Sequence, residues 1–286
     1  LAQPAVDEFS PLELSSLNFQ SHIEQTAFEK MVEEARSLIR QGDMFQCVLS
    51  QRFSAEYSGR PLDYYRNLRV TNPSNYLYFY DFGDYQIIGA SPESLVSVKQ
   101  GQVTTNPIAG TRPRGQDERE DKALAKELLA DEKEVAEHRM LVDLGRNDIG
   151  KIAQNNSVEV TKYMEVEYFR YVMHLTSVVR GQLLPQLTAM DALKSTLPAG
   201  TVSGAPKIRA MKRIYELEQE KRGVYAGAIG YLSATGDMDF AIAIRTMVLK
   251  NGRAYVQAGA GIVYDSIPAN EYQETINKAK SMTKIG

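Results

Sequence analysis

Two short segments place carboxylate side chains on one face of an expected helix. They span residues 134–138 and 271–278 of this chain. Their charged members are Glu134, Glu137, His138, Glu271, Glu274 and Lys278. Residues three or four apart on a helix point the same way, and like charges at that spacing repel each other by about 0.2–0.5 kcal/mol. Such clusters are either solvated surface, which is the usual case, or a place where a cation neutralises them.

The kind of cation follows from the other residues that could bind a metal. The chain has three histidines, His22, His138 and His174, and one cysteine, Cys47. No Cys or His pair occurs at zinc-ligand spacing, so the carboxylate pairs favour Mg²⁺ over zinc. His174 lies in the apolar run VMHLT at 172–176, where a buried core histidine is the simpler interpretation.

Three further features could bind an anion, and each has a structural alternative. The segment QAGAGI at 257–262 lacks the third glycine of a dinucleotide fingerprint, but its small residues would admit either an anion or tight strand packing. The segment TVSGAPK at 201–207 would place a hydroxyl, amides and a lysine at a helix N-terminus. Arg245 interrupts a nearly apolar expected strand, so its partner is either a substrate carboxylate or a structural acid.

Composition excludes several classes of protein. The 286 residues are 43% hydrophobic and 24% charged, which is enough to bury one large core or two small ones. The net charge of −3 provides no basic footprint for nucleic acid. A single cysteine suits a reducing compartment, and no apolar run is long enough for a membrane helix. We therefore expect a cytoplasmic enzyme or enzyme subunit and, since the chain begins at Leu1, a piece of a longer protein.

The elements that must position these residues fall into groups. Periodicity predicts helices over 26–40, 117–149 and 186–220, and strands at 44–53, 75–82, 85–90, 94–99, 102–108, 224–234, 239–250 and 253–258. The strands between 75 and 108 are expected to form one antiparallel meander, and Asn251-Gly252 predicts a hairpin. Ser203 and Pro206 are expected to cap and begin a helix. Grouped antiparallel strands with grouped helices indicate an α+β fold.

Five motifs together resemble one family, the chorismate-utilising enzymes, and within it the members that form anthranilate. They are GASPE at 89–93, PIAGTRPRG at 107–115, EHRMLVDL at 137–144, LPAGTVSGAPK at 197–207 and AGAGIV at 258–263. The resemblance extends over nearly all of residues 26–282. It implies an α/β sandwich in which two antiparallel sheets pack together with helices outside. It further implies that 26–286 form the chorismate-binding catalytic domain, and that 1–25 are an extension from a missing N-terminal region.

The same resemblance implies roles for individual residues. Glu137 and Glu274 would hold Mg²⁺, with Glu134 and Glu271 in support or bound through water. The residues implied to bind the substrate are Gly110, Thr111, Tyr225, Arg245, Gly259, Ala260, Gly261 and Lys278. Glu93 would be the general acid that protonates the departing 4-hydroxyl, His174 would assist the elimination of pyruvate, and Thr201 would lie close to the reacting ligand.

Two positions help to choose among members of the family. Gln46 stands where isochorismate and salicylate synthases have a water-activating lysine, and Ala109 stands where many aminodeoxychorismate synthases have a lysine. Neither residue can act as a base or a nucleophile. The resemblance therefore implies a carbon–oxygen lyase of tryptophan biosynthesis that converts chorismate and ammonia to anthranilate and pyruvate.

Two other functions stay open. The chain could be an aminodeoxychorismate synthase of the folate pathway, or a non-catalytic module that binds a glutaminase. No Gly-x-Cys-x-Gly nucleophile segment occurs in the chain, so ammonia would come from solution or from a glutamine amidotransferase subunit.

Overall fold

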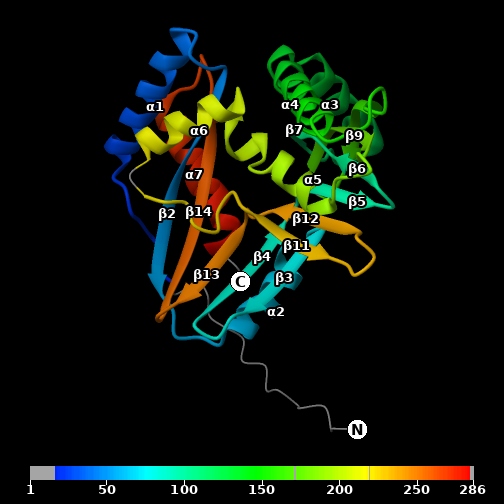
Figure 1. Cartoon of the computed structure of the whole chain (residues 1–286). Coiled ribbons are helices and arrows are strands. Elements are labelled where there is room, and N and C mark those ends of the chain that lie inside the picture. Colours follow the sequence, from blue (N-terminus) through cyan, green and yellow to red (C-terminus); the bar gives the residue numbers. More distant parts are fainter. Residues whose placement is uncertain (1–16, 171, 219, 284–286) are drawn as a thin grey trace, which may run out of the picture. The chain divides into compact units, whose positions relative to one another are not determined.

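The computed structural model describes residues 17–170, 172–218 and 220–283 (Figure 1). The described chain divides into two compact units. Unit 1 contains residues 17–92, 212–225 and 243–283, and unit 2 contains residues 93–211 and 226–242. Residues 1–16 of the predicted N-terminal extension lie outside the described range. Its remaining part includes strand β1 (Gln20–Ser21), which pairs with a strand of unit 1.

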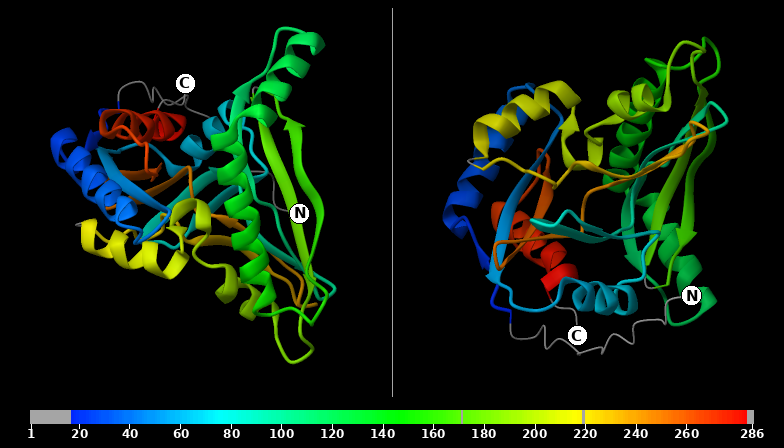
Figure 2. Two further views of the ribbon diagram at one scale, coloured as in Figure 1. Left: turned by 90° about the horizontal axis from the view of Figure 1, so that it is seen from above. Right: turned by 60° about the horizontal axis from the view of Figure 1, so that its bottom comes forward.

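Unit 1 contains an antiparallel sheet with strand order β1-β2-β14-β13-β4-β3. The strands are β2 (Gln46–Glu56), β3 (Tyr76–Asp81), β4 (Tyr85–Ser91), β13 (Thr246–Lys250) and β14 (Arg253–Ile262), and the helices are α1 (Gln25–Arg40), α2 (Pro61–Thr71) and α7 (Pro268–Thr283). Figure 2 shows α1 and α7 next to each other, in contact with β2 and β14. The long β2–β14 ladder thus carries the glycine-rich segment of β14 beside α7, which bears the second carboxylate cluster.

The amphipathic pattern of α1 explains how this helix is attached. Phe28 and Val32 are fully buried, and they pack in one cluster with Leu49 and Ile262 of the sheet. Each fully buried side chain of this size contributes about 1.5–3 kcal/mol relative to an exposed one. The polar face of α1 stays in solvent, as expected for an apolar stripe with the helical period.

Unit 2 contains a second antiparallel sheet, with strand order β11-β12-β5-β6-β9-β7 and β8 paired to β9. The strands are β5 (Ser94–Lys99), β6 (Gln102–Thr105), β7 (Ile108–Pro113), β8 (Glu159–Tyr168), β9 (Val172–Gln182), β11 (Ala228–Leu232) and β12 (Met238–Ile242). The helices are α3 (Glu118–Ala130), α4 (Glu132–Gly150) and α5 (Ala189–Thr196). Helix α4 packs on β7 and β9. Helix α6 (Lys207–Leu217) follows a short 3₁₀ turn at Gly200–Val202.

The expectation of two antiparallel sheets with helices is confirmed, but the predicted meander over 75–108 is wrong. Strand β4 pairs with β3 and β13 in unit 1, whereas β5 pairs with β6 and β12 in unit 2. The chain passes from one unit to the other at Pro92–Glu93. Alternation and turn residues indicate strands but carry no information about which sheet a strand joins, so the crossing has the same local pattern as a hairpin.

Three segments that were predicted as single elements are each divided in the structure, and one pair of strands was not predicted. The strand predicted at 239–250 is divided into β12 and β13, because Arg245 has a positive φ of 47°. The helical region predicted at 117–149 breaks at Asp131, whose side chain caps α4 by accepting hydrogen bonds from the next backbone N–H groups. The region 186–220 likewise contains two helices, and the 3₁₀ turn at Gly200–Val202 and the short strand β10 (Gly204–Ala205) lie between them. Strands β8 and β9 occupy a stretch for which the periodicity indicates no element.

Within the described residues, no helix is both long and apolar enough to span a membrane.

Candidate functional site

The predicted site residues are divided between the two units. Unit 2 carries Glu93, Gly110, Thr111, Glu134, Glu137, His174 and Thr201, and unit 1 carries Tyr225, Arg245, Gly259, Ala260, Gly261, Glu271, Glu274 and Lys278. Each unit is described in turn.

In unit 2, the first acidic cluster lies at the start of α4. Glu134 is partly buried, and its pKa is raised by burial and by the negative charge of Glu137. Arg112 Nη1 lies 3.6 Å from Glu134 Oε1 and offsets part of that charge. Two crowded carboxylates, one of them disfavoured as an anion, are a donor set that suits a hard cation such as Mg²⁺.

His138 does not join this cluster, contrary to the helical-face expectation. Its side chain is buried, and its Nε2 lies 2.6 Å from Ser177 Oγ of β9. Burial lowers the pKa of His138 to about 4, so the imidazole is neutral near pH 7. The residue next to Glu137 therefore belongs to the packing of α4 on the sheet.

His174 projects from β9 toward the irregular part of β7. Its Nδ1 donates a hydrogen bond of 2.8 Å to the carbonyl oxygen of Gly110 and lies 3.1 Å from Thr111 Oγ1. Gly110 has a φ of 70°, and the ladder register of β7 shifts at this point. His174 is partly exposed rather than buried in the core, and with Nδ1 as the donor its Nε2 remains an acceptor. The simpler interpretation of His174 as a buried core histidine is therefore wrong.

Gly110 is also constrained by its surroundings. A Cβ atom at this position would lie 3.0 Å from Leu128 Cδ1 and 3.4 Å from Glu134 Oε2. The bulge of β7 therefore brings His174 and the first acidic cluster to the same region of unit 2. Positive φ and a close approach both favour glycine here.

Replacing His174 with Ala is expected to remove the acceptor nitrogen while leaving the sheet intact. If His174 assists the elimination step that the sequence resemblance implies, chorismate should still be consumed, and an aminated, non-aromatic intermediate should accumulate in place of anthranilate. Mass spectrometry of the products measures this, and Thr104→Val, which removes a hydroxyl group from another strand of unit 2, is a control. Anthranilate release by His174→Ala at the unmodified rate would leave His174 with a structural role only.

The segment after β7 is anchored by an ion pair. Arg114 Nε lies 3.0 Å from Asp121 Oδ1, and the backbone N–H of Gly115 donates to the same oxygen at 2.7 Å. The hydrogen bonds from Arg114 and then from Gly115 hold the pKa of Asp121 below its usual value. A carboxyl group with a lowered folded-state pKa stabilises the fold above its unfolded pKa of about 4, and this stabilisation is lost as the pH falls through the folded pKa.

Asp121→Asn should therefore lower the melting temperature at pH 7, and the difference from the unmodified protein should shrink steadily below pH 4. Thermal unfolding at a series of pH values measures this. Glu118→Gln, which alters an exposed pair on the same helix, is the matched control and should have little effect. A pH-independent difference for Asp121→Asn would mean that the carboxylate charge is not what anchors the segment.

Glu93 and Thr201 meet in unit 2. The Thr201 hydroxyl donates a hydrogen bond of 3.1 Å to Glu93 Oε2, and the backbone oxygen of Glu93 accepts from Ile242 N–H at 3.0 Å. Thr201 lies in the 3₁₀ turn at Gly200–Val202. A Cβ atom at Gly200 would overlap the side chain of Leu144, so glycine allows the turn to approach α4. The strand edge and the turn together fix the carboxyl group of Glu93.

The anion-binding hypothesis for 201–207 is not supported. Lys207 Nζ lies 2.5 Å from Asp148 Oδ2 and 2.9 Å from the carbonyl oxygen of Thr196. Ser203 does not cap α6, because its hydroxyl donates to the Ala199 carbonyl at 2.7 Å. The lysine is thus paired within unit 2, so Ser203 and Lys207 have structural roles, whereas Thr201 of this motif contacts Glu93, a predicted catalytic residue.

In unit 1, the glycine-rich end of β14 is surrounded by predicted site residues. A Cβ atom at Gly259 would lie 2.6 Å from the Tyr225 hydroxyl, and one at Gly261 would lie 2.7 Å from Gln46 Nε2. Lys278 Nζ donates to the Gly259 carbonyl at 3.1 Å and lies 2.6 Å from Glu274 Oε1. The glycines therefore allow close packing inside a strand, and they also leave their backbone beside polar groups.

Two predicted substrate-binding residues of unit 1 lie differently from the sequence-based prediction: the side chain of Ala260 is buried, and Arg245 lies outside a strand. Ala260 is fully buried in the cluster under α1, so only its backbone is available to a ligand. Arg245 lies between two strands and is exposed, not buried within a strand. Its backbone oxygen accepts from Ala90 N–H at 3.1 Å, which holds its main chain while its side chain remains accessible to solvent.

Sequence reasoning missed the residues that hold Tyr225. The Arg222 guanidinium lies over the Tyr225 ring at 5.5 Å and donates to the Val48 carbonyl oxygen at 2.6 Å. Glu218 accepts from Arg222 Nε at 2.8 Å and from Ser50 N–H at 2.8 Å. An arginine four residues after a glutamate was a signal for this pair, but the ring it supports is visible only in the structure.

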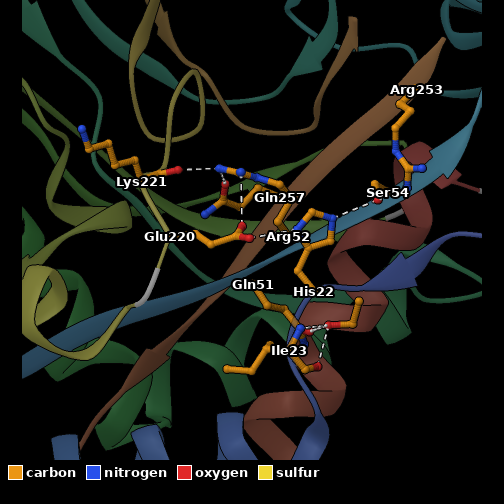
Figure 3. A network of polar contacts seen from close by, with 10 residues as sticks. His22, Ile23, Gln51, Arg52, Ser54, Glu220, Lys221, Arg253 and Gln257 are labelled. Carbon is orange, nitrogen blue, oxygen red and sulfur yellow. Dashed lines mark hydrogen bonds and ion pairs between the residues drawn. The ribbon is translucent and has the colours of Figure 1, made fainter. Parts of the chain in front are cut away.

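A polar network extends this attachment along β2 (Figure 3). His22 lies 3.0 Å from Glu220 and 2.9 Å from Ser54, and Arg52 Nη1 lies 3.2 Å from Glu220 Oε2. Arg52 also donates to Gln257 of β14. These contacts tie the segment that leads to Tyr225 onto the sheet.

Within the described ranges, no three His, Cys, Asp or Glu side chains form a preassembled metal site. The acidic residues remain as pairs, Glu134 with Glu137 on α4 and Glu271 with Glu274 on α7.

The sequence of this chain is similar to those of several known proteins. The model of the chorismate binding enzyme family matches residues 5–284. Anthranilate synthase component 1 of Lactococcus lactis subsp. lactis (strain IL1403) is 64% identical over 274 residues, which cover 96% of this chain and 60% of that protein. The protein of the same name from Aquifex aeolicus (strain VF5) is 54% identical over 267 residues, 93% of this chain and 54% of that protein. This chain thus spans little more than half the length of these relatives.

Two solved structures are also similar to this chain in fold. Anthranilate synthase component I from Streptococcus pneumoniae TIGR4 is 80% identical, with a TM-score of 0.92 over 98% of this chain and 62% of that one. MenF, the menaquinone-specific isochorismate synthase from Escherichia coli, is 25% identical, with a TM-score of 0.82 over 94% of this chain and 63% of that one.

Proposed function

Because the chain belongs to the chorismate binding enzyme family, we propose that it catalyses the Mg²⁺-dependent conversion of chorismate and ammonia to anthranilate and pyruvate. The observation that carries this choice is the contrast in identity, 54–80% to the anthranilate synthases compared above against 25% to an isochorismate synthase. The name component 1 of the relatives supports a second component as partner, which we propose to be a glutamine amidotransferase that supplies ammonia. We propose the cytoplasm as the compartment.

The residue at position 46 supports ammonia as the nucleophile. Gln46 is buried beside Gly261 of β14. An amide cannot take a proton from water, whereas ammonia carries a lone pair and needs no such base. Ala109 of β7 likewise cannot form a covalent adduct, which disfavours the aminodeoxychorismate synthase alternative.

Glu137 and Glu274, supported by Glu134 and Glu271, are the residues that we propose to hold Mg²⁺. Their fit rests on the crowded pair of α4, where burial and the charge of Glu137 raise the pKa of Glu134. Bound there, Mg²⁺ would neutralise the ring carboxylate of chorismate and help to orient the ring.

Polar groups of unit 1 are proposed to bind the enolpyruvyl carboxylate. Tyr225 and Lys278 both lie at Gly259, and a guanidinium such as that of Arg245 can bind a carboxylate through two hydrogen bonds. The backbone N–H groups near Gly261 would add further donors.

Two side chains of unit 2 are proposed to move protons. Glu93, oriented by Thr201, gives a proton to the 4-hydroxyl as the C4–O bond breaks and ammonia forms the C2–N bond. His174, whose Nδ1 is committed to Gly110, accepts the C2 proton at Nε2 while the C3–O bond breaks. The leaving group departs as the enolate of pyruvate, which takes up one proton at its methylene carbon to become pyruvate, and the ring becomes aromatic.

Arg245→Met should keep much of the apolar stem and delete the bidentate contact. A charge-assisted hydrogen bond contributes about 1.5–3 kcal/mol, so chorismate affinity should fall by about one to two decades. Binding per folded molecule is measured by titration, with Arg253→Met, another arginine of unit 1, as the control. An unfolded variant, or unchanged chorismate affinity, would favour a structural role for the guanidinium.

The assay that tests the whole proposal mixes protein, chorismate, Mg²⁺ and ammonium at alkaline pH and follows anthranilate fluorescence. Aminodeoxychorismate in place of anthranilate would favour the folate-pathway alternative. Absence of any chorismate conversion by the full-length protein would favour a module that only binds a glutaminase.

A further inference from the structure

A small cavity in unit 2 adjoins the carboxyl group of Glu93. Its volume is about 60 Å³. Pockets that bind metabolites usually measure about 300–1,000 Å³, whereas one water needs only about 10–15 Å³. The cavity is therefore too small for chorismate and large enough for a few water molecules. The lining residues that matter here are Glu93, Ser94, Thr105, Gly145, Asp148 and Thr201.

Two buried hydroxyl groups line this cavity without a protein partner. The side chain of Thr105 is only 7% exposed, and its Oγ1 has no hydrogen-bond partner among the described residues. The buried Oγ of Ser94 likewise has no hydrogen-bond partner among the described residues. Buried hydroxyl groups are nearly always hydrogen-bonded to protein or to an ordered water. Both residues line the same cavity, and an occupant that both donates and accepts hydrogen bonds would satisfy their hydroxyl groups.

Charged groups complete the lining. Glu93 accepts from Thr201 through Oε2, and Asp148 is paired with Lys207 at 2.5 Å and with Lys151 at 3.1 Å. Gly145 of α4 leaves the space open, because a Cβ atom there would lie 3.1 Å from Thr105 Oγ1. Among apolar neighbours, the lining thus includes two residues with hydroxyl groups and two with carboxyl groups, and an ordered water needs two to four such polar partners.

We propose that this cavity binds water, ordered by the Thr105 hydroxyl, that returns a proton to Glu93 after each turnover. The proposal rests on the function proposed above. A threonine hydroxyl can accept one hydrogen bond and donate another, so Thr105 holds the water in place for proton transfer. Thr105 is a positioning residue and Glu93 remains the catalytic acid.

Every proton lost in the amination step is matched by one gained. Glu93 gives its proton to the 4-hydroxyl oxygen, the C4–O bond breaks with both electrons on that oxygen, and water leaves. Ammonia supplies the electron pair of the C2–N bond and becomes an ammonium group. This group loses one proton to solvent, and one proton returns from solvent through the cavity water to the Glu93 carboxylate.

Three variants test the cavity. Thr105→Val keeps the shape and removes the hydroxyl, Thr105→Ser keeps the hydroxyl, and Gly145→Ala fills the space beside it. In the ammonia-dependent assay of the full-length protein, Thr105→Val and Gly145→Ala should lower kcat by about tenfold or more with little change in KM for chorismate. This loss is part of the factor of about 10²–10⁴ that a general acid contributes. Thr105→Ser should restore kcat, and the solvent isotope effect on kcat should rise in Thr105→Val.

Matched controls make the same substitutions elsewhere in unit 2. Thr104→Val alters the neighbouring residue, whose side chain projects from the opposite face of β6, and Gly150→Ala alters a glycine of α4 with open space around it. Both should leave kcat unchanged. Thr105→Val and Gly145→Ala with unmodified kcat would overturn the proposal, as would equal losses of kcat in the controls.

A readout that does not depend on activity separates this proposal from the proposed function. A high-resolution crystal structure of the unmodified protein should contain an ordered water within hydrogen-bond distance of Thr105 Oγ1, and Thr105→Val should lose it. A dry cavity would overturn the proposal even in an active enzyme. Unmodified protein that forms no anthranilate would overturn the proposed function, whatever the cavity contains.

Discussion

Glu93→Gln should nearly abolish formation of the aminated product, because the rate of the first half-reaction should fall by about 10²–10⁴-fold. Hydroxide is a poor leaving group, and a carboxamide cannot supply the proton that turns it into water. The variant should fold normally, because Gln can still accept the hydrogen bond from Thr201. Chorismate consumption and anthranilate fluorescence measure the loss.

The same variant also separates the two half-reactions. Supplied with the aminated intermediate, Glu93→Gln should still release anthranilate and pyruvate, because the proton at C2 is assigned to His174. Thr201→Val, which leaves the acid in place and removes only its hydrogen-bond donor, is the matched control and should lose less. Amination by Glu93→Gln at the unmodified rate would assign the acid to another group.

Glu137→Gln and Glu274→Gln should each raise the Mg²⁺ concentration needed for half-maximal activity by at least about 10–100-fold. Loss of a group that merely supports a ligand has an effect of this size on metal affinity, and a direct ligand should matter at least as much. Both variants should remain folded: Glu274 is an exposed residue whose pair with Lys278 contributes about 0–1 kcal/mol. Activity measured against Mg²⁺ concentration, alongside thermal unfolding, tests both statements.

The α4 helix offers a control for this experiment. Glu132→Gln removes an exposed carboxylate from the first turn of the same helix and should leave the Mg²⁺ dependence unchanged. If Glu137→Gln behaves like Glu132→Gln, the α4 cluster is solvated surface and the metal is held elsewhere. If only Glu274→Gln is unaffected, Glu274 leaves the proposed ligand set and Glu137 stays in it.

Local pattern alone was enough for elements whose signal lies in a short stretch of chain. The apolar period over 26–40 predicts a helix, and α1 spans Gln25–Arg40. Asn251-Gly252 predicts a hairpin, and the pair connects β13 to β14 with φ values of 51° and 69°. Positive φ at both positions is what this two-residue turn requires, so two adjacent residues carry the whole signal. The five motifs likewise allow the family to be inferred before any contact is known.

Only the tertiary structure decided which strands share a sheet and which way several side chains point. Strands β4 and β5 are both predicted by local pattern and are separated only by Pro92 and Glu93, yet they belong to different units. His138 shares a helix with Glu134 and Glu137, but it packs against Ser177 of β9. Arg245 lies in an apolar run, but a single positive φ places it between two strands. These outcomes depend on partners far away in the chain, such as β2 for β14, and a local pattern of hydrophobicity and turns carries no record of distant partners.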